Sequence, residues 1–163
     1  TGATLIIDGG ILTNLCGESW EGIEVWGDAS QPQLTANNSP QGVLKMQNCA
    51  VIENAHDAVR LWKGGDYYST GCVVQARNST FRNNSRDVEF ISYKNFKPAD
   101  PSLEIDNISS FDSCAFVTDA SLHGNMNLRP HITMWDVHGV KIFGNTLRRL
   151  ISSLNSDNWE RLV

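Results

Sequence analysis

The sequence of 163 residues predicts an all-β solenoid, because one strand-turn-strand pattern recurs along it at a regular interval. The stretches VIENAHDAVRLW and STFRNNSRDVEF each place a bulky residue two positions before an Asn, at Ile52–Asn54 and at Phe81–Asn83. An apolar pair follows each Asn at the same distance. Apolar and polar residues alternate within these segments, as in strands with one buried face. Self-similarity of this kind indicates a stack of repeated turns.

Further copies of the pattern extend it into three apolar columns. The first column contains Leu12, Ile52, Phe81, Phe116 and Phe143; the second contains Ile23, Val59, Val88 and Ile132; the third contains Val25, Leu61, Phe90 and Met134. We expect each column to face the core and consecutive copies to stack as parallel strands. A pile of antiparallel hairpins is the alternative, but the sequence lacks the two-residue Asn-Gly turns typical of hairpins. The columns therefore favour a parallel β-helix.

An Asn column accompanies the apolar ones, at Asn14, Asn54, Asn83 and Asn145. Asn tolerates the left-handed backbone conformation that a sharp corner requires, and its side chain can bond an Asn one turn away. We therefore predict a structural role at corners between strands, and not a polar binding track.

The C-terminal stretch NTLRRLISSL differs from the rest of the chain, because its apolar residues have helical spacing. Leu147, Leu150, Ile151 and Leu154 lie at i, i+3, i+4 and i+7. The sequence predicts a short helix or an irregular segment here, before a further turn of the solenoid.

Composition limits the classes of protein and partner. Residues 1–163 fit a single domain, and the chain opens in a strand without Met, so we expect a fragment of a larger protein. A net charge of −5 argues against nucleic acid as a partner. No segment approaches the roughly 18 apolar residues of a membrane span. The spacing of the four Cys residues favours buried thiols over a disulfide framework.

Several segments also carry a family resemblance. GILTNLCGESWEGIEVWG, GVLKMQNCAVIENAHDAV, NSTFRNNSRDVEFISY and HITMWDVHGVKIFGNT resemble right-handed parallel β-helix repeat regions of large secreted bacterial surface proteins, typically exported by the type IX route. The resemblance covers nearly the whole chain. It implies a right-handed parallel β-helix at an extracellular or cell-surface location. It implies no catalytic residue. The aligned copies of the pattern predict about four to five coils.

A row of charged residues lies between the second and third apolar columns, on the predicted outer face. It consists of the charged residues Glu24, Arg60 and Glu89, followed by the neutral Thr133. Parallel strands lie about 4.8 Å apart, so alternating charges can pair along the row. Exposed ion pairs contribute about 0–1 kcal/mol each, so we expect the row mainly to fix the strand register.

An aromatic row follows the third column, at Trp26, Trp62 and Trp135, with Ile91 in the same position of the third copy. Long insertions leave the repeats just after these positions and should emerge along one edge of the solenoid, often the binding edge. The candidate ligand-binding residues are Trp26, Trp62, Trp135, Tyr67, Tyr68 and Asp66. The alternative, which we favour, is that the loops fold back and bury the aromatic row.

Other chemical motifs are weak. His131, Asp136 and His138 suggest a metal site, but no fourth ligand is apparent, so we predict neither a metal nor another cofactor. Acidic-polysaccharide lyases on this fold need clustered carboxylates beside a basic residue, and the carboxylates here look scattered. His56 and the hydroxyl of Ser19 form no recognisable nucleophile motif, so no catalytic residue is predicted.

Two function classes remain. The first is a non-catalytic module, a rigid structural or adhesive element that contacts glycans or another surface protein. The second is a polysaccharide-active enzyme, a lyase or glycoside hydrolase, on the same scaffold. The scattered carboxylates favour the first class, since the fold alone hosts both. Uncapped ends of the solenoid would also permit self-association.

Overall fold

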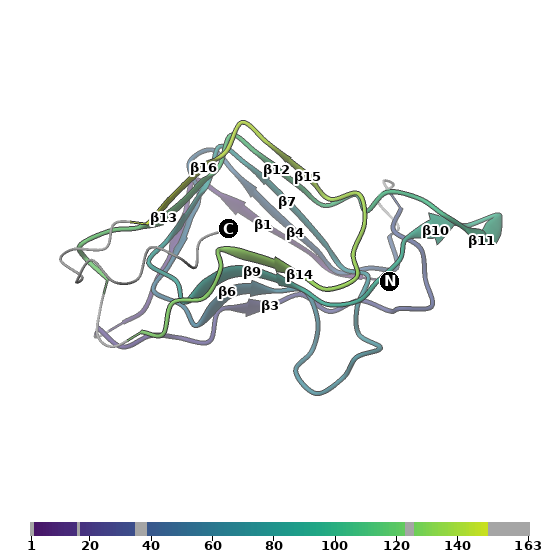
Figure 1. Ribbon diagram of the computed structural model, residues 1–163, viewed down its shortest axis with the longest axis horizontal. Helices are drawn as coiled ribbons and strands as arrows, with labels where there is room; N and C mark the ends of the chain where they lie inside the picture. Colours follow the sequence, from purple (N-terminus) through teal and green to yellow (C-terminus); the bar gives the residue numbers. More distant parts are fainter. Residues whose placement is uncertain (1, 16, 35–38, 123–125, 150–163) are drawn as a thin grey trace, which may run out of the picture.

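The computed structural model describes residues 2–15, 17–34, 39–122 and 126–149. Three parallel sheets form the sides of a triangle (Figure 1). The first sheet contains β1 (Thr4–Asp8), β4 (Val43–Gln47), β7 (Val73–Arg77), β12 (Ser110–Asp112) and β15 (Lys141–Phe143). The second contains β2 (Ile11–Leu12), β5 (Val51–Glu53), β8 (Thr80–Arg82), β13 (Ala115–Thr118) and β16 (Thr146–Arg149). The third contains β3 (Ile23–Glu24), β6 (Asp57–Arg60), β9 (Arg86–Phe90) and β14 (Ile132–Met134).

The chain passes through the first, second and third sheets in the same order each time, interrupted only by the antiparallel hairpin of β10 (Phe96–Lys97) and β11 (Asp100–Glu104). We call each passage through the sheets a turn. The described residues contain strands and no helix, so the predicted all-β class with parallel strands is confirmed. This order is compatible with a β-helix or solenoid.

Strand register confirms most of the predicted apolar columns. Ile52 pairs with Leu12 on one side and Phe81 on the other, and Phe116 pairs with Phe81. In the third sheet, Val88 pairs with Val59. These residues are buried, Leu12 partly, and lie opposite one another in register, so stacking the turns places one inward apolar residue above another.

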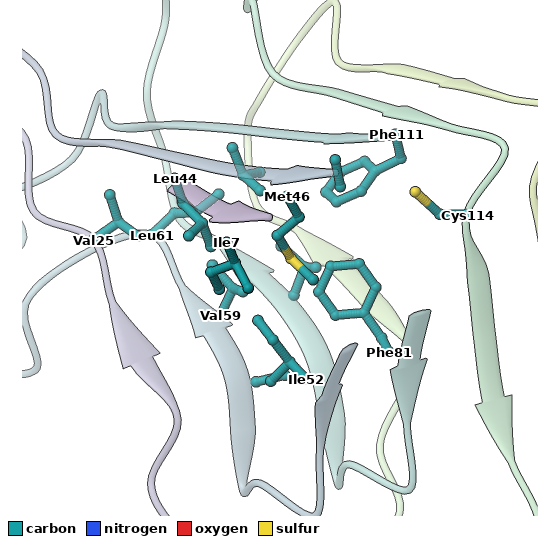
Figure 2. Packing of buried hydrophobic residues seen from close by; sticks show 14 of the residues in the cluster. Ile7, Val25, Leu44, Met46, Ile52, Val59, Leu61, Phe81, Phe111 and Cys114 are labelled. Carbon is teal, nitrogen blue, oxygen red and sulfur yellow. The ribbon is translucent and has the colours of Figure 1, made fainter. Parts of the chain in front are cut away.

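The core fills the space between the three sheets, where side chains of all three meet (Figure 2). Phe81, Phe111 and Phe116 are fully buried. The rings of Phe81 and Phe116 stack with their centroids 4.9 Å apart, and Phe111 packs edge-on against both. The aromatic cluster joins the first and second sheets, since Phe111 belongs to β12 and the other two to β8 and β13.

Two predicted Asn residues hold corners as expected. Asn54 and Asn83 have φ values of 59° and 55°, in the left-handed region. The Asn54 side chain donates to the Asn14 side-chain oxygen one turn away, at 2.9 Å. Asn145 acts differently, because its side chain accepts the N–H of Cys114 while the neighbouring Gly144 has the positive φ.

The last repeat of the sequence alignment is wrong. Phe143 lies in β15 of the first sheet, pairs with Asp112 and is 59% exposed. Leu147, in β16, pairs with Phe116 and is the true continuation of the first column. The predicted helix is therefore wrong over Thr146–Arg149, which is a strand, and the rest of the predicted segment lies outside the described residues.

Loops and thiols differ in part from expectation. The connections β3–β4, β6–β7 and β9–β12 all join the third sheet to the first, as predicted for one edge. A further long connection, β13–β14, joins the second sheet to the third, so the long loops do not share a single edge. Cys72 and Cys114 are buried free thiols, but Cys49 is exposed at a corner with a φ of 64°. Cys16 lies outside the described residues.

Candidate functional site

The predicted charged row lies on the outer face of the third sheet. Glu24 pairs with Arg60 and Arg60 pairs with Glu89 in the strand register. One guanidinium nitrogen of Arg60 lies 2.9 Å from the Glu24 carboxylate, and another lies 3.7 Å from the Glu89 carboxylate. The row is more enclosed than predicted, since only 11% of the Glu89 side chain and 21% of the Arg60 side chain are exposed.

Two ion pairs within strands extend this row into a network. In β9, Arg86 lies 2.5 Å from Glu89, three residues later, and in β6 Asp57 and Arg60 make the same contact at 2.7 Å. The N–H groups of Asp87 and Val88 both donate to the carbonyl of His131 in the next turn. Arg86 also donates to Asp57 in the neighbouring turn, at 2.7 Å. Asp57 and Arg86 also lie opposite each other in the strand register.

The carboxylates of the network gather around two guanidinium groups, although they looked scattered in the sequence. Burial by itself raises the pKa of Asp57, but the hydrogen bond from Arg60 and the charge of Arg86 outweigh burial, so the pKa is lowered. The pKa of Glu24 is also lowered, because hydrogen bonds from Trp26 and Arg60 outweigh the opposing effect of burial. These two acids stay ionised at neutral pH, which suits an ion-pair network better than general acid catalysis.

The lowered pKa of Asp57 makes the stability of the fold depend on acid. The ionised Asp57 stabilises the fold fully above pH 3.8, which is the ordinary pKa of the group. This stabilisation is lost as the pH falls through the lower pKa that Asp57 has in the folded protein. We expect the urea midpoint of unfolding to drop between about pH 5 and pH 2. In Asp57→Asn, the free energy of unfolding at pH 7 should fall by about 1.5–3 kcal/mol, and the acid dependence should become shallower. An unchanged acid slope in Asp57→Asn would assign the dependence to other groups.

The aromatic row lies beside the charged row. Trp26 and Trp135 are 52% and 67% exposed, so the prediction that loops bury the whole row is wrong. Trp62 is half-buried. The indole N–H of Trp26 donates to Glu24, and that of Trp62 donates to Glu89 of the next turn, both at 2.9 Å. The carboxylates of the charged row therefore fix the orientation of two of the indole rings.

The faces of these rings are unequally available. Tyr67 stacks on Trp62 with the ring centroids 5.5 Å apart and the planes within 13°, so it covers one face of the indole. The ammonium group of Lys63 lies 5.0 Å from the centroid of the Trp26 ring. Tyr67 and Tyr68 are 71% and 83% exposed. The outer aromatic surface is thus formed by Trp26, Tyr67 and Tyr68, with Trp62 beneath Tyr67.

Asp66 has a structural role in the loop that carries the two tyrosines. One of its carboxylate oxygens accepts the N–H of Tyr68 at 3.0 Å, and its backbone N–H donates to the carbonyl of Lys63. These bonds close a tight turn. The same loop is tied to the one after β3, because the N–H of Ala29 donates to the carbonyl of Tyr68. The candidate residues Trp26 and Tyr68 therefore lie on loops fixed to each other.

Buried amide side chains, which the sequence analysis missed, hold the loops together. The Gln41 side chain is fully buried and donates to the carbonyls of Asp28 and Gln31. The Gln33 side chain donates to the carbonyls of Gly71 and Cys72 and accepts the N–H of Ile108, so it links three loops. Satisfied buried amides of this kind rigidify the backbone that they bridge.

The weaker candidates are separated or incomplete. His131 bonds the buried Asp87, while Asp136 and His138 face other partners, and the described residues contain no group of three metal-ligand side chains. Ser19 and His56, which showed no motif in the sequence, lie 3.0 Å apart. The described residues supply no group that orients the His56 ring, as nucleophilic catalysis requires.

Comparison of the chain with protein families, curated proteins and solved structures gave no match. Within the part of the chain that the structure describes, no helix is long and apolar enough to cross a membrane.

Proposed function

We propose that this chain is a right-handed parallel β-helix of about four to five coils and forms a non-catalytic module of a secreted or cell-surface bacterial protein. The repeated order of strands through three parallel sheets supports the helical winding. Parallel crossover connections are right-handed in nearly all known cases, which supports the hand. The resemblance of the repeats to secreted surface proteins supports the location. In such a solenoid each turn packs on its neighbours, which makes a rigid spacer.

The module contacts glycans through its aromatic surface. The observation that carries this proposal is the aromatic surface of exposed rings beside the charged row, at Trp26, Tyr67 and Tyr68. Trp135 is a further exposed ring, two turns along the row. Aromatic rings offer flat apolar faces together with a polar group, and sugar rings present matching C–H faces. The carboxylates of Glu24 and Glu89 fix the indole rings before any ligand arrives, which reduces the entropy lost on binding.

Substitutions in the aromatic surface separate binding from stability. Tyr67→Ala should abolish most retention on a glycan that the wild type binds, with a nearly unchanged melting temperature, because the ring is exposed. Trp62→Ala should lower both, since Trp62 supports Tyr67 and packs among Arg60 and Glu89. Affinity electrophoresis on a panel of neutral and acidic polysaccharides and thermal unfolding measure the two effects.

The control is Leu103→Ala, which removes an exposed apolar side chain from β11, outside the aromatic surface. It should leave both measurements unchanged. Loss of retention in this control, or wild-type retention in Tyr67→Ala, would contradict the proposed surface. Wild-type failure to bind any polysaccharide of the panel would leave the spacer role and remove the glycan contact.

A polysaccharide-active enzyme is the second candidate, because the structure brings Glu24, Asp57 and Glu89 together around Arg60 and Arg86. A lyase needs a base. Burial by itself lowers the pKa of Arg60, but the hydrogen bonds that Arg60 donates to the carboxylates of Asp57 and Glu24 outweigh burial, so the pKa is raised. The charged network therefore favours binding or structure over proton transfer. A depolymerisation screen with and without calcium tests this, and turnover at enzyme-like rates would overturn the non-catalytic proposal.

A further inference from the structure

The loop between β6 and β7 carries an exposed cation beside the aromatic surface. The N–H of Asp66 donates to the carbonyl of Lys63 at 2.9 Å, which closes a β-turn over Gly64 and Gly65. Gly65 has a positive φ of 83°, which glycine adopts without strain. The N–H of Lys63 donates to the hydroxyl of Ser69 at 2.6 Å. The backbone at Lys63 is therefore fixed, in a part of the stack that has described turns on both sides.

The charge of Lys63 pairs with no carboxylate among the residues that the structure describes. Its ammonium group lies 5.0 Å from the centroid of the Trp26 ring, within the range of a cation–π contact. An ammonium group has three N–H donors and the ring approaches it from one side, so donors remain for a ligand. The contact also holds the long side chain in place before binding, which reduces the entropy lost when a ligand arrives.

The nearest acidic side chains are engaged with other donors. Glu24 lies 2.9 Å from a guanidinium nitrogen of Arg60. Asp66 accepts the N–H of Tyr68 at 3.0 Å. The ammonium group of Lys63 is therefore a charge that a ligand can neutralise, next to rings on which a sugar can stack.

We propose that the glycan bound by the aromatic surface is acidic, and that a carboxylate or sulfate group of the sugar chain pairs with the ammonium group of Lys63. This inference rests on the glycan contact proposed above and names its substrate class. The ring of Tyr67 or Tyr68 contacts the face of one sugar unit, while the anionic group of that unit or of its neighbour reaches Lys63. Stacking alone accepts many sugars, and charge complementarity adds the selectivity.

Short oligosaccharides are the suitable probes, because the net charge of −5 repels long polyanions from the rest of the protein. Oligogalacturonate and oligomannuronate, each compared with its own methyl ester, change the charge and leave the sugar ring in place. A sulfated galactan oligosaccharide and its desulfated form make the same comparison for sulfate. In isothermal titration calorimetry, the wild type should bind the charged member of at least one pair about three- to tenfold more tightly. Preference in either kind of pair supports the inference and identifies the anionic group.

Substitution of Lys63 locates the preference. Lys63→Gln should lower the affinity for the charged oligosaccharide to that for its neutral form, and the affinity for the neutral form should not change. Lys63→Arg should retain the preference, since it keeps the charge. Tyr67→Ala should weaken both forms alike, because its ring contacts the sugar whatever charge the sugar carries. Lys45→Gln, which removes an exposed cation from β4 on the outer face of the first sheet, is the control and should bind as the wild type does.

The outcomes separate this inference from the glycan contact on which it rests. Equal wild-type affinity for charged and neutral forms, or an unchanged preference in Lys63→Gln, would overturn the acidic class and leave the glycan contact standing. Wild-type failure to bind any sugar of the panel would remove both. An oligoglutamate that binds as tightly as the uronates would show a contact by charge alone and would also overturn the inference. The comparison of acid and ester uses the wild type, so it does not depend on the folding of any variant.

Discussion

Replacing Phe81 with alanine is expected to lower the free energy of unfolding by about 3–5 kcal/mol, the usual cost of removing a buried phenylalanine ring. Phe81 has no exposed surface. Its ring stacks on Phe116 and meets the edge of Phe111, so truncation leaves a cavity between two sheets that neighbouring turns hold in place. Urea titration measures the loss as a fall in the midpoint at a constant slope.

Phe143→Ala provides a matched control for this experiment. The sequence pattern assigns Phe143 and Phe81 to the same column, whereas the structure leaves Phe143 59% exposed in β15. The control should therefore change the free energy of unfolding by about 0.5 kcal/mol or less. Equal losses in the two variants would favour the sequence alignment over the observed register.

Replacing Arg86 with methionine is expected to lower the free energy of unfolding by about 3–5 kcal/mol, because it leaves two buried carboxylates with only one of their two guanidinium partners. Arg86 is 9% exposed and binds Asp57 and Glu89, whose side chains are 5% and 11% exposed. The loss should shrink in acid, where the carboxylates become neutral. Chemical denaturation at neutral and acidic pH measures both effects.

Arg77→Met serves as the control for this prediction. Arg77 also pairs with a carboxylate, Asp112 at 3.4 Å, but its side chain is 74% exposed. An exposed pair of this kind contributes about 0–1 kcal/mol, so the control should show little loss. If Arg77→Met and Arg86→Met lowered the free energy of unfolding equally, burial would not explain the effect of replacing Arg86.

The sequence predicted the stacked columns because a bulky apolar residue recurs at the same place in each middle turn, as Ile52, Phe81 and Phe116 show. The alignment of repeats was wrong at the last turn, because two of the corners in each turn carry similar residues. Asn78 and Gly144 hold the corner between the first and second sheets with φ values of 46° and 65°, while Asn54 and Asn83 hold the next corner. A bulky residue before such a corner occurs in both places, so one motif matched the wrong corner.

Two features of the candidate site had no local signal in the sequence. The ion pair between Arg86 and Glu89 joins residues three apart in one strand, which a regular alternation of sides would place on opposite faces. The buried side-chain amide of Gln33 bonds backbone groups of other loops. The sequence shows only that residue 33 is polar, and not which groups it bonds. The exposure of Trp26 likewise depends on where the loops pack, and repeat position does not determine that.

The charged network alters how the fold can come apart. A stack of turns with contacts only between neighbours frays from its ends, one unit after another. Here Arg60 of the second turn binds Glu24 of the first turn and contacts Glu89 of the third. Arg86 returns from the third turn to Asp57 of the second. Fraying that begins at either end must therefore break shared charge pairs before it can advance. We expect the first three turns to open as a cooperative unit, whose amide hydrogens exchange with solvent more slowly than those of the other described residues.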